Sequence, residues 1–109
     1  MKRISESQIE EAILEYLNIS GYFAWKNPSA GFHDGKGWRK QASRFAINGV
    51  ADIISIKSGA VRFLEIKTDV GIQSEAQIAF EAKLELHGGQ YFLVRSVKEV
   101  RELVKSGKI

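Results

Sequence analysis

The 109-residue sequence contains no cysteine, a single proline and two histidines. Without cysteine, disulfides and thiolate zinc sites are excluded, and the redox compartment is left open. Two histidines cannot build a metal site alone. No apolar run approaches the length of a membrane span, and the basic start MKRISESQ has no hydrophobic signal region behind it. We therefore expect a cytoplasmic protein.

Apolar residues make up 44% of the chain, which is enough for one hydrophobic core of ordinary size. The chain is too short for two such cores, so we expect one domain over residues 1–109. It carries 16 Lys+Arg and 13 Asp+Glu, a net charge of +3, with a pI of about 9.3. This excess permits a polyanionic partner but is too small to identify one. The positions of the charges therefore matter more than their sum.

The hydrophobic pattern predicts helices and strands along most of the chain. Ser5 and Ser7 precede Gln8 and Glu10 by three residues, and Ser74 likewise precedes Gln77, which is the spacing of a capping box at the start of a helix. A third helix should span residues 97–106. Strands are expected at residues 22–26, 44–48, 51–57, 61–67 and 91–95.

Residues 28–43, PSAGFHDGKGWRKQAS, hold three glycines, a proline and no periodicity, which predicts a long loop. We call this segment the basic loop. Basic side chains surround Trp38, and they are Lys36, Arg39, Lys40 and Arg44, which directly follows the loop. Cationic and aromatic side chains in this mixture are typical of proteins that bind nucleic-acid strands, although composition alone also allows a solvated loop. We predict that these residues, together with Lys26, contact DNA.

The stretch GVADIISIKSGAVRFLEIK, residues 49–67, predicts a hairpin with a two-residue Ser-Gly turn. That turn fixes a register in which Asp52 stands opposite Glu65 on the same face of the sheet. Lys67, two residues beyond Glu65, shares this face. A three-residue loop with a bulge would shift the register by one residue and separate the carboxylates.

Two carboxylates that face each other on a sheet repel, which disfavours this pair as a purely structural choice. A divalent cation removes the conflict, because Mg²⁺ commonly takes one or two carboxylates as ligands. Lys67 could then orient an attacking water or stabilise charge on a phosphate. The simpler interpretation is a surface ion pair between Glu65 and Lys67, with Asp52 capping a turn. The opposed aspartate favours the metal site.

These residues resemble a known nuclease signature. Asp52, followed on the paired strand by E-I-K at residues 65–67, resembles the PD-(D/E)xK motif, with Ala51 where a proline often stands. More narrowly, GVAD, LEIKTDVGIQSEAQIAF and GGQYFLVRS resemble the VRR-NUC group, and the lead helix resembles that of archaeal Holliday-junction resolvases. The resemblance spans residues 6–104. It implies an α/β fold with a mixed central sheet flanked by helices, in the order α-β-β-β-α-β-α, with the basic loop inserted.

Carried over position by position, the resemblance also implies a metal site. The ligands of Mg²⁺ or Mn²⁺ would be Asp52, Glu65 and the backbone carbonyl of Ile66. Lys67 matches the catalytic lysine of the family.

Two further positions match side chains that complete such sites. A helical acid falls on Glu10 by the family's spacing, whereas the helical periodicity favours Glu6, which lies nearer the centre of the apolar stripe. We follow the spacing and predict Glu10. Gln77 matches a glutamine on the second helix, and its capping box with Ser74 explains it equally well.

The function implied by the resemblance is a metal-dependent DNA endonuclease that cleaves branched DNA, such as Holliday junctions or flaps, in repair, recombination or phage replication. The resemblance also implies a homodimer, as in the stand-alone minimal members of this group. The exposed aromatic residues of the basic loop and the apolar side of the final helix are candidate dimer surfaces, the latter formed by Val97, Val100, Leu103 and Val104. One alternative is a non-catalytic DNA-binding domain that keeps the nuclease fold. Another is a small protein-interaction domain without a nucleic-acid role.

Overall fold

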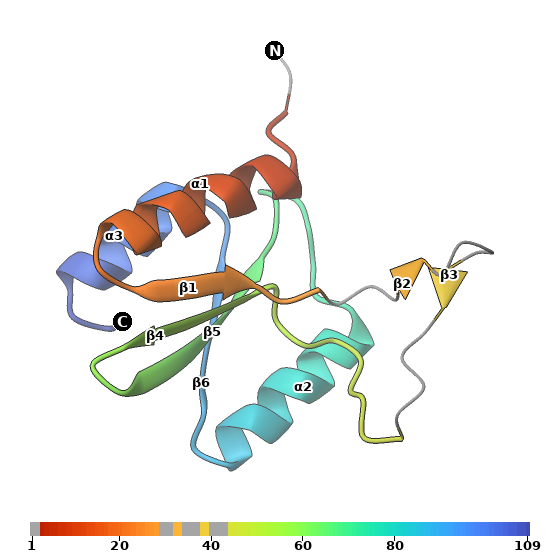
Figure 1. Cartoon of the computed structure of the whole chain (residues 1–109). Helices are drawn as coiled ribbons and strands as arrows, with labels where there is room; N and C mark the ends of the chain where they lie inside the picture. Colours follow the sequence, from red (N-terminus) through yellow and green to blue (C-terminus); the bar gives the residue numbers. More distant parts are fainter. Residues whose placement is uncertain (1–2, 29–31, 34–37, 40–43) are drawn as a thin grey trace.

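The computed structural model describes residues 3–28, 32–33, 38–39 and 44–109, and it has the predicted mixed sheet flanked by helices (Figure 1). The helices are α1 (Glu6–Ile19), α2 (Glu75–Leu86) and α3 (Val97–Lys105). The sheet contains β1 (Phe23–Lys26), β4 (Ile53–Lys57), β5 (Ala60–Ile66) and β6 (Gln90–Val94). Two short strands, β2 (Phe32–His33) and β3 (Trp38–Arg39), pair with each other within the basic loop.

The sheet has the strand order β1-β4-β5-β6. Its first two strand pairs are antiparallel, and β5 pairs with β6 in parallel. A parallel pair needs a crossover connection, which α2 provides between β5 and β6. Apart from the inserted pair β2-β3, the chain therefore follows the predicted order α-β-β-β-α-β-α.

The hydrophobic core lies on one face of the sheet, beneath α1 and α3 (Figure 1). Ile13 and Leu17 of α1 and Leu64 and Ile66 of β5 are all fully buried there. The opposite face carries α2, which has no fully buried residue. Only part of that second face is shielded, so polar side chains can lie on it near solvent.

Of the two serines that could open the first helix, Ser5 forms the capping box, and Ser7 lies within α1. The hydroxyl of Ser5 accepts from the amide of Gln8 at 3.2 Å, and the Gln8 side chain accepts from the Ser5 amide at 2.9 Å. The same exchange joins Ser74 to Gln77 at the start of α2. None of the helices in the described ranges has the length and apolar character that crossing a bilayer requires.

The predicted strand at residues 44–48 is wrong, because these residues form turns and irregular backbone. Strand β1 pairs directly with β4, and the segment instead leads past the start of α2, where Gly49 approaches Ala76. Phe45 and Ile47 are 77% and 57% exposed. The alternation of apolar and polar residues in this segment therefore does not correspond to a strand with one buried face. The basic loop, for which no strand is predicted, nevertheless contains the pair β2-β3.

The apolar side of α3 packs against the core of its own chain and is not free to contact a second subunit. Val100 is fully buried, and Val97, Leu103 and Val104 are partly buried against the core cluster. The helix, one of the two candidate dimer surfaces, is therefore occupied by the core of its own chain. The periodicity correctly predicts an apolar stripe, but the stripe packs inward onto α1 and β6.

Candidate active site

The hairpin β4-β5 has the predicted register. Ser58 and Gly59 form its two-residue turn with φ values of 51° and 80°, the left-handed conformation that such turns require. The regular pairing runs down the hairpin to Ile53 opposite Leu64. The next opposed position is that of the two predicted acids, just past the end of β4.

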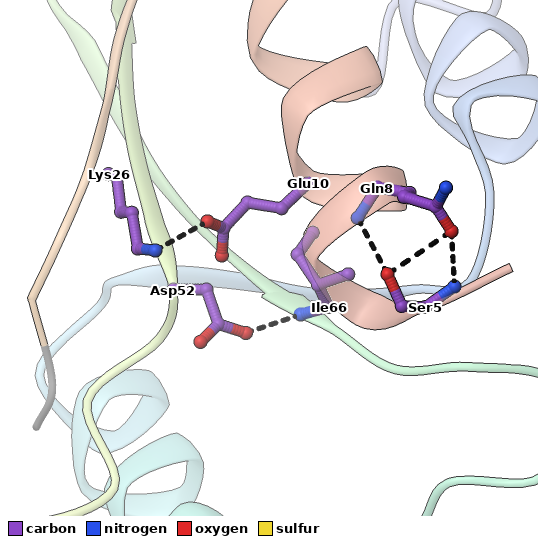
Figure 2. Close-up of polar contacts among 6 residues, drawn as sticks. All are labelled: Ser5, Gln8, Glu10, Lys26, Asp52 and Ile66. Atoms are coloured by element: carbon purple, nitrogen blue, oxygen red, sulfur yellow. Dashed lines mark hydrogen bonds and ion pairs between the residues drawn. The ribbon is translucent and has the colours of Figure 1, made fainter.

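At Asp52, a side-chain hydrogen bond to β5 replaces the regular backbone pairing of β4 with β5. Its Oδ2 atom accepts a hydrogen bond from the amide of Ile66 at 2.8 Å (Figure 2), and its backbone carbonyl accepts from the amide of Asn27 at 2.7 Å. The carboxylate is therefore held by the end of β5, and the backbone by the chain that follows β1. The simpler interpretation, that Asp52 caps backbone, is thus partly correct, but the same carboxyl group also contacts Glu65.

Gly49 allows the segment before Asp52 to pack closely against the start of α2. Its φ is +80°, and a Cβ atom placed there would overlap the carbonyl group of Ala76 and lie 2.7 Å from the amide nitrogen of Gln77. Only glycine fits this approach without moving backbone. The contact brings the Asp52 segment next to the helix that carries Gln77.

Glu65 is a buried carboxyl group beside a second carboxyl group. It is 1% exposed, and its pKa is raised to about 8. Burial contributes most to this rise, followed by the hydrogen-bonding contact and the charge of Asp52, while the charge of Lys67 acts in the opposite direction. The predicted juxtaposition of Asp52, Glu65 and Lys67 is therefore present in the fold.

Gln77 makes the contacts expected from both interpretations of the sequence, the capping box and a position beside the acids. Its Oε1 atom accepts from the amide of Ser74 at 2.8 Å and completes the capping box. Its Nε2 atom donates to Oε2 of Glu65 at 2.8 Å. The cap fixes the side chain at the helix start, and this orientation aims the amide nitrogen at the buried carboxyl group.

Tyr91 of β6 is a polar residue that sequence reasoning missed. Its hydroxyl donates to Oε1 of Glu65 at 3.4 Å, and burial together with the charges of Glu65 and Glu81 raises its pKa above the ordinary tyrosine range. The parallel pairing places Tyr91 beside Phe63, two residues before Glu65 on the same face. Alternation within β6 was visible in the sequence, but the register between β5 and β6 was not.

Glu10 and Glu6 differ sharply in their surroundings. Glu6 is exposed, whereas Glu10 is 8% exposed and forms an ion pair with Lys26 at 3.2 Å. Figure 2 shows the Glu10 carboxylate extending from α1 toward Lys26 of β1. The buried position is the one that the family spacing selects. Its role in catalysis stays a prediction, because its partner in the structure is a lysine that the sequence assigns to DNA contact.

Lys67 follows Glu65 at the end of β5 and is half-buried. Its backbone amide donates to the carbonyl of Val94 at 3.1 Å. The loop after it is tied to β6 by Arg95, whose guanidinium donates to the carbonyls of Thr68 and Gly71 at 2.5 and 2.8 Å. The backbone on both sides of the lysine is therefore anchored.

The oxygen atoms at this site suit a hard divalent cation. Asp52 and Glu65 supply neighbouring carboxyl groups whose mutual repulsion a cation would relieve. Over the described ranges, no three acidic or histidine side chains come together as a ready-made metal cluster. Glu10 therefore does not complete a set of three carboxylates in this arrangement.

The predicted DNA contacts are only partly described. Lys36 and Lys40 lie outside the described residues, and Trp38 and Arg39 form β3. Arg44 is exposed, with its guanidinium carbon 4.8 Å from the centre of the Phe45 ring. Figure 1 shows β2 and β3 projecting beyond the end of β1, away from the main sheet.

Comparison with known proteins gives one result that bears on this geometry. No family model and no curated protein matches the sequence. A solved structure described as a VRR_NUC domain superposes with a TM-score of 0.67 at 19% identity, over 92% of this chain and 94% of its own. The chain therefore has the fold of a VRR-NUC domain, as its motifs predicted.

Proposed function

We propose that this protein, which has the VRR-NUC fold, is a metal-dependent DNA endonuclease that hydrolyses phosphodiester bonds. The observation that carries the proposal is the pair of carboxyl groups formed by the buried Glu65 and the half-buried Asp52, with Lys67 beside them. Such a pair lowers the stability of the fold, because the two carboxylates repel each other when both are ionised. A function that uses the pair explains that cost.

The metal ligands in this proposal are the carboxylates of Asp52 and Glu65 and the backbone carbonyl of Ile66. Mg²⁺ or Mn²⁺ bound there supplies a Lewis acid and lowers the pKa of a coordinated water. The chain prepares the ligands in two ways. The Ile66 amide holds the Asp52 carboxylate, and the Gln77 amide holds the Glu65 carboxylate.

Lys67 provides the positive charge that the reaction needs. Its ammonium group can donate hydrogen bonds to a phosphate oxygen or orient the attacking water, and either contact stabilises negative charge in the transition state. Glu10 lies on α1 as a further acid, and it would have to leave its ion pair with Lys26 to contact the cation or its water. Lys26, whose side chain is 61% exposed, is then released to meet DNA phosphates.

The proposed substrate is branched DNA, such as a four-way junction or a flap. The resemblance to junction resolvases supports this choice, and the basic loop supplies phosphate-seeking and stacking side chains in its sequence. Glu65 lies on the sheet face that carries α2, and Asp52 and Lys67 beside it are only half-buried. A DNA backbone can therefore approach the site at these two residues.

We also propose that the protein acts as a homodimer, which would place two sites for paired cuts. Apolar residues line up across three strands, with Phe23 beside Ile56 and Ile56 beside Val61. Phe23 and Val61 are 65% and 41% exposed, and the ring centre of Phe23 lies 4.8 Å from that of Trp25, itself 36% exposed. This row is the apolar surface that we assign to the second subunit.

The proposal is tested by cleavage of a labelled four-way junction, a flap and a linear duplex in Mg²⁺ or Mn²⁺. Asp52→Asn and Lys67→Met should each lower the cleavage rate by at least about 100-fold, since each removes a group used in the transition state. Lys83→Met is the matched control, because Lys83 is an exposed lysine of α2. It should cleave like the wild type.

Each outcome distinguishes the candidate functions. Cleavage that requires a divalent ion and Asp52 supports the nuclease. Salt-sensitive DNA binding without cleavage by any metal or substrate would replace it with a non-catalytic DNA-binding domain. Cleavage by Lys67→Met at the wild-type rate would remove the role assigned to the lysine.

A further inference from the structure

A chain of hydrogen bonds runs from the side of α2 to the buried carboxyl group of Glu65. Gln73, in the segment before α2, donates from Nε2 to Oε1 of Glu81 at 3.0 Å and to the hydroxyl of Tyr91 at 3.1 Å. The Tyr91 hydroxyl donates in turn to Oε1 of Glu65. The contacts involve a loop, a helix and two strands, so the arrangement exists only in the folded protein.

The chemistry of the end groups fixes the direction of this chain. An ionised glutamate has only acceptor atoms, so the side chain of Gln73 must present its nitrogen to Glu81. The second hydrogen of that nitrogen points to the oxygen of Tyr91. A tyrosine hydroxyl has a single hydrogen, which is then directed to Glu65 because Gln73 already donates to the hydroxyl oxygen.

The consequence is that each oxygen of Glu65 receives one donor from the α2 side of the site. Oε1 accepts from Tyr91, and Oε2 accepts from Gln77 at 2.8 Å. Two donors on different oxygens set the rotation of the carboxylate plane. Each oxygen keeps a further lone pair, which can face Asp52 and a shared cation.

We propose that Tyr91 and Gln73 are positioning residues that orient Glu65 as a ligand for a divalent cation. The inference rests on the metal site in the proposed function, and it adds residues that touch neither metal nor DNA. Hydrogen-bond partners behind a metal ligand fix its geometry and typically change metal affinity by about 10- to 100-fold when removed. Packing alone does not explain Tyr91, because its ring contact with Phe80 at 6.3 Å needs no hydroxyl.

The test is Mn²⁺ binding to the DNA-free protein, measured by calorimetry and by the electron paramagnetic resonance of free Mn²⁺. Tyr91→Phe keeps the ring and deletes the hydroxyl, so we expect about 10-fold weaker Mn²⁺ binding. Gln73→Met is the second variant, because Gln73 lies outside the buried core. Without the Gln73 amide, the Tyr91 hydroxyl is free to rotate away from Glu65. We expect it to weaken binding by a smaller factor.

Tyr22→Phe is the matched control. Tyr22 is 5% exposed, and its hydroxyl donates to the carbonyl of Ile109 at 3.1 Å, on the core side of the sheet. This variant should lower the melting temperature without changing Mn²⁺ affinity. In cleavage assays, Tyr91→Phe should raise the half-saturating Mn²⁺ concentration and leave the KM for DNA unchanged.

Mn²⁺ binding by folded Tyr91→Phe and Gln73→Met at the wild-type affinity would overturn the inference, as would the absence of Mn²⁺ binding by the wild type. Weaker binding by Tyr22→Phe to the same extent would also overturn it, because the effect would then reflect stability. If the wild type binds Mn²⁺, Tyr91→Phe binds it weakly and neither cuts DNA, the positioning role stands and the nuclease proposal fails.

Discussion

Replacing Glu65 by glutamine should remove a loss of stability that the metal-free protein undergoes as the pH rises. The pKa of Glu65 rises from 4.5 to about 8 in the fold, so the folded state binds its proton more tightly than the unfolded state does. The stability contributed by this proton is complete below about pH 4.5 and is lost as the pH rises through about 8. Glutamine carries no charge at any pH and lacks this dependence.

The size of the effect follows from the shift. At about 1.4 kcal/mol per pKa unit, the interval from 4.5 to about 8 sets an upper limit of about 5 kcal/mol for ionising Glu65 in the fold. Glutamine at this position would turn its own amide nitrogen toward one of the donors, Gln77 or Tyr91, which costs about 1 to 2 kcal/mol. The wild type should therefore be more stable near pH 5, and Glu65→Gln more stable by up to about 4 kcal/mol near pH 9.

The assay is urea unfolding at pH 5, 7 and 9 in the presence of a chelator. Glu85→Gln, an exposed glutamate of α2, is the control and should show no change of sign. Mg²⁺ added at pH 9 should stabilise the wild type and leave Glu65→Gln unaffected, because only the wild type keeps both carboxylates. A stability difference between Glu65→Gln and the wild type that is constant from pH 5 to 9 would refute the reasoning.

Three further predictions test the backbone, the dimer and the ion pair. Gly59→Ala should lower the free energy of unfolding by about 1 kcal/mol, and Gly49→Ala by at least twice as much. Both glycines have φ of +80°, but of the two only Gly49 lies against backbone atoms. Equal losses in urea unfolding would contradict the close approach of Gly49 to α2. Phe23→Ser should shift the protein to monomers in light scattering with an unchanged melting temperature, and a monomeric wild type would exclude the dimer. Lys26→Met should destabilise the fold by about 1 kcal/mol or less, since the lysine that pairs with Glu10 is exposed; a larger loss in urea unfolding would show that the buried acid depends on it.

Features that depend on neighbouring residues in the chain could be predicted from the sequence. The capping box of Ser5 needs only a glutamine three residues later, and it forms as predicted. The hairpin register follows from a two-residue turn, so the opposition of Asp52 and Glu65 could be predicted before any contact was known. The local pattern was sufficient because the atoms that interact are joined by short stretches of backbone.

The sequence by itself therefore determined the helices with their caps, the central hairpin and the pair of acids at its end. Only the tertiary structure decided that Glu10 rather than Glu6 is buried, that residues 44–48 are not a strand, and that Tyr91 donates to Glu65. Each of these outcomes depends on how segments far apart in the chain pack together, through the docking of α1 and α2 and the parallel register of β5 with β6. Periodicity within one segment shows which side of it is apolar, but it does not show which distant side chain that segment will meet.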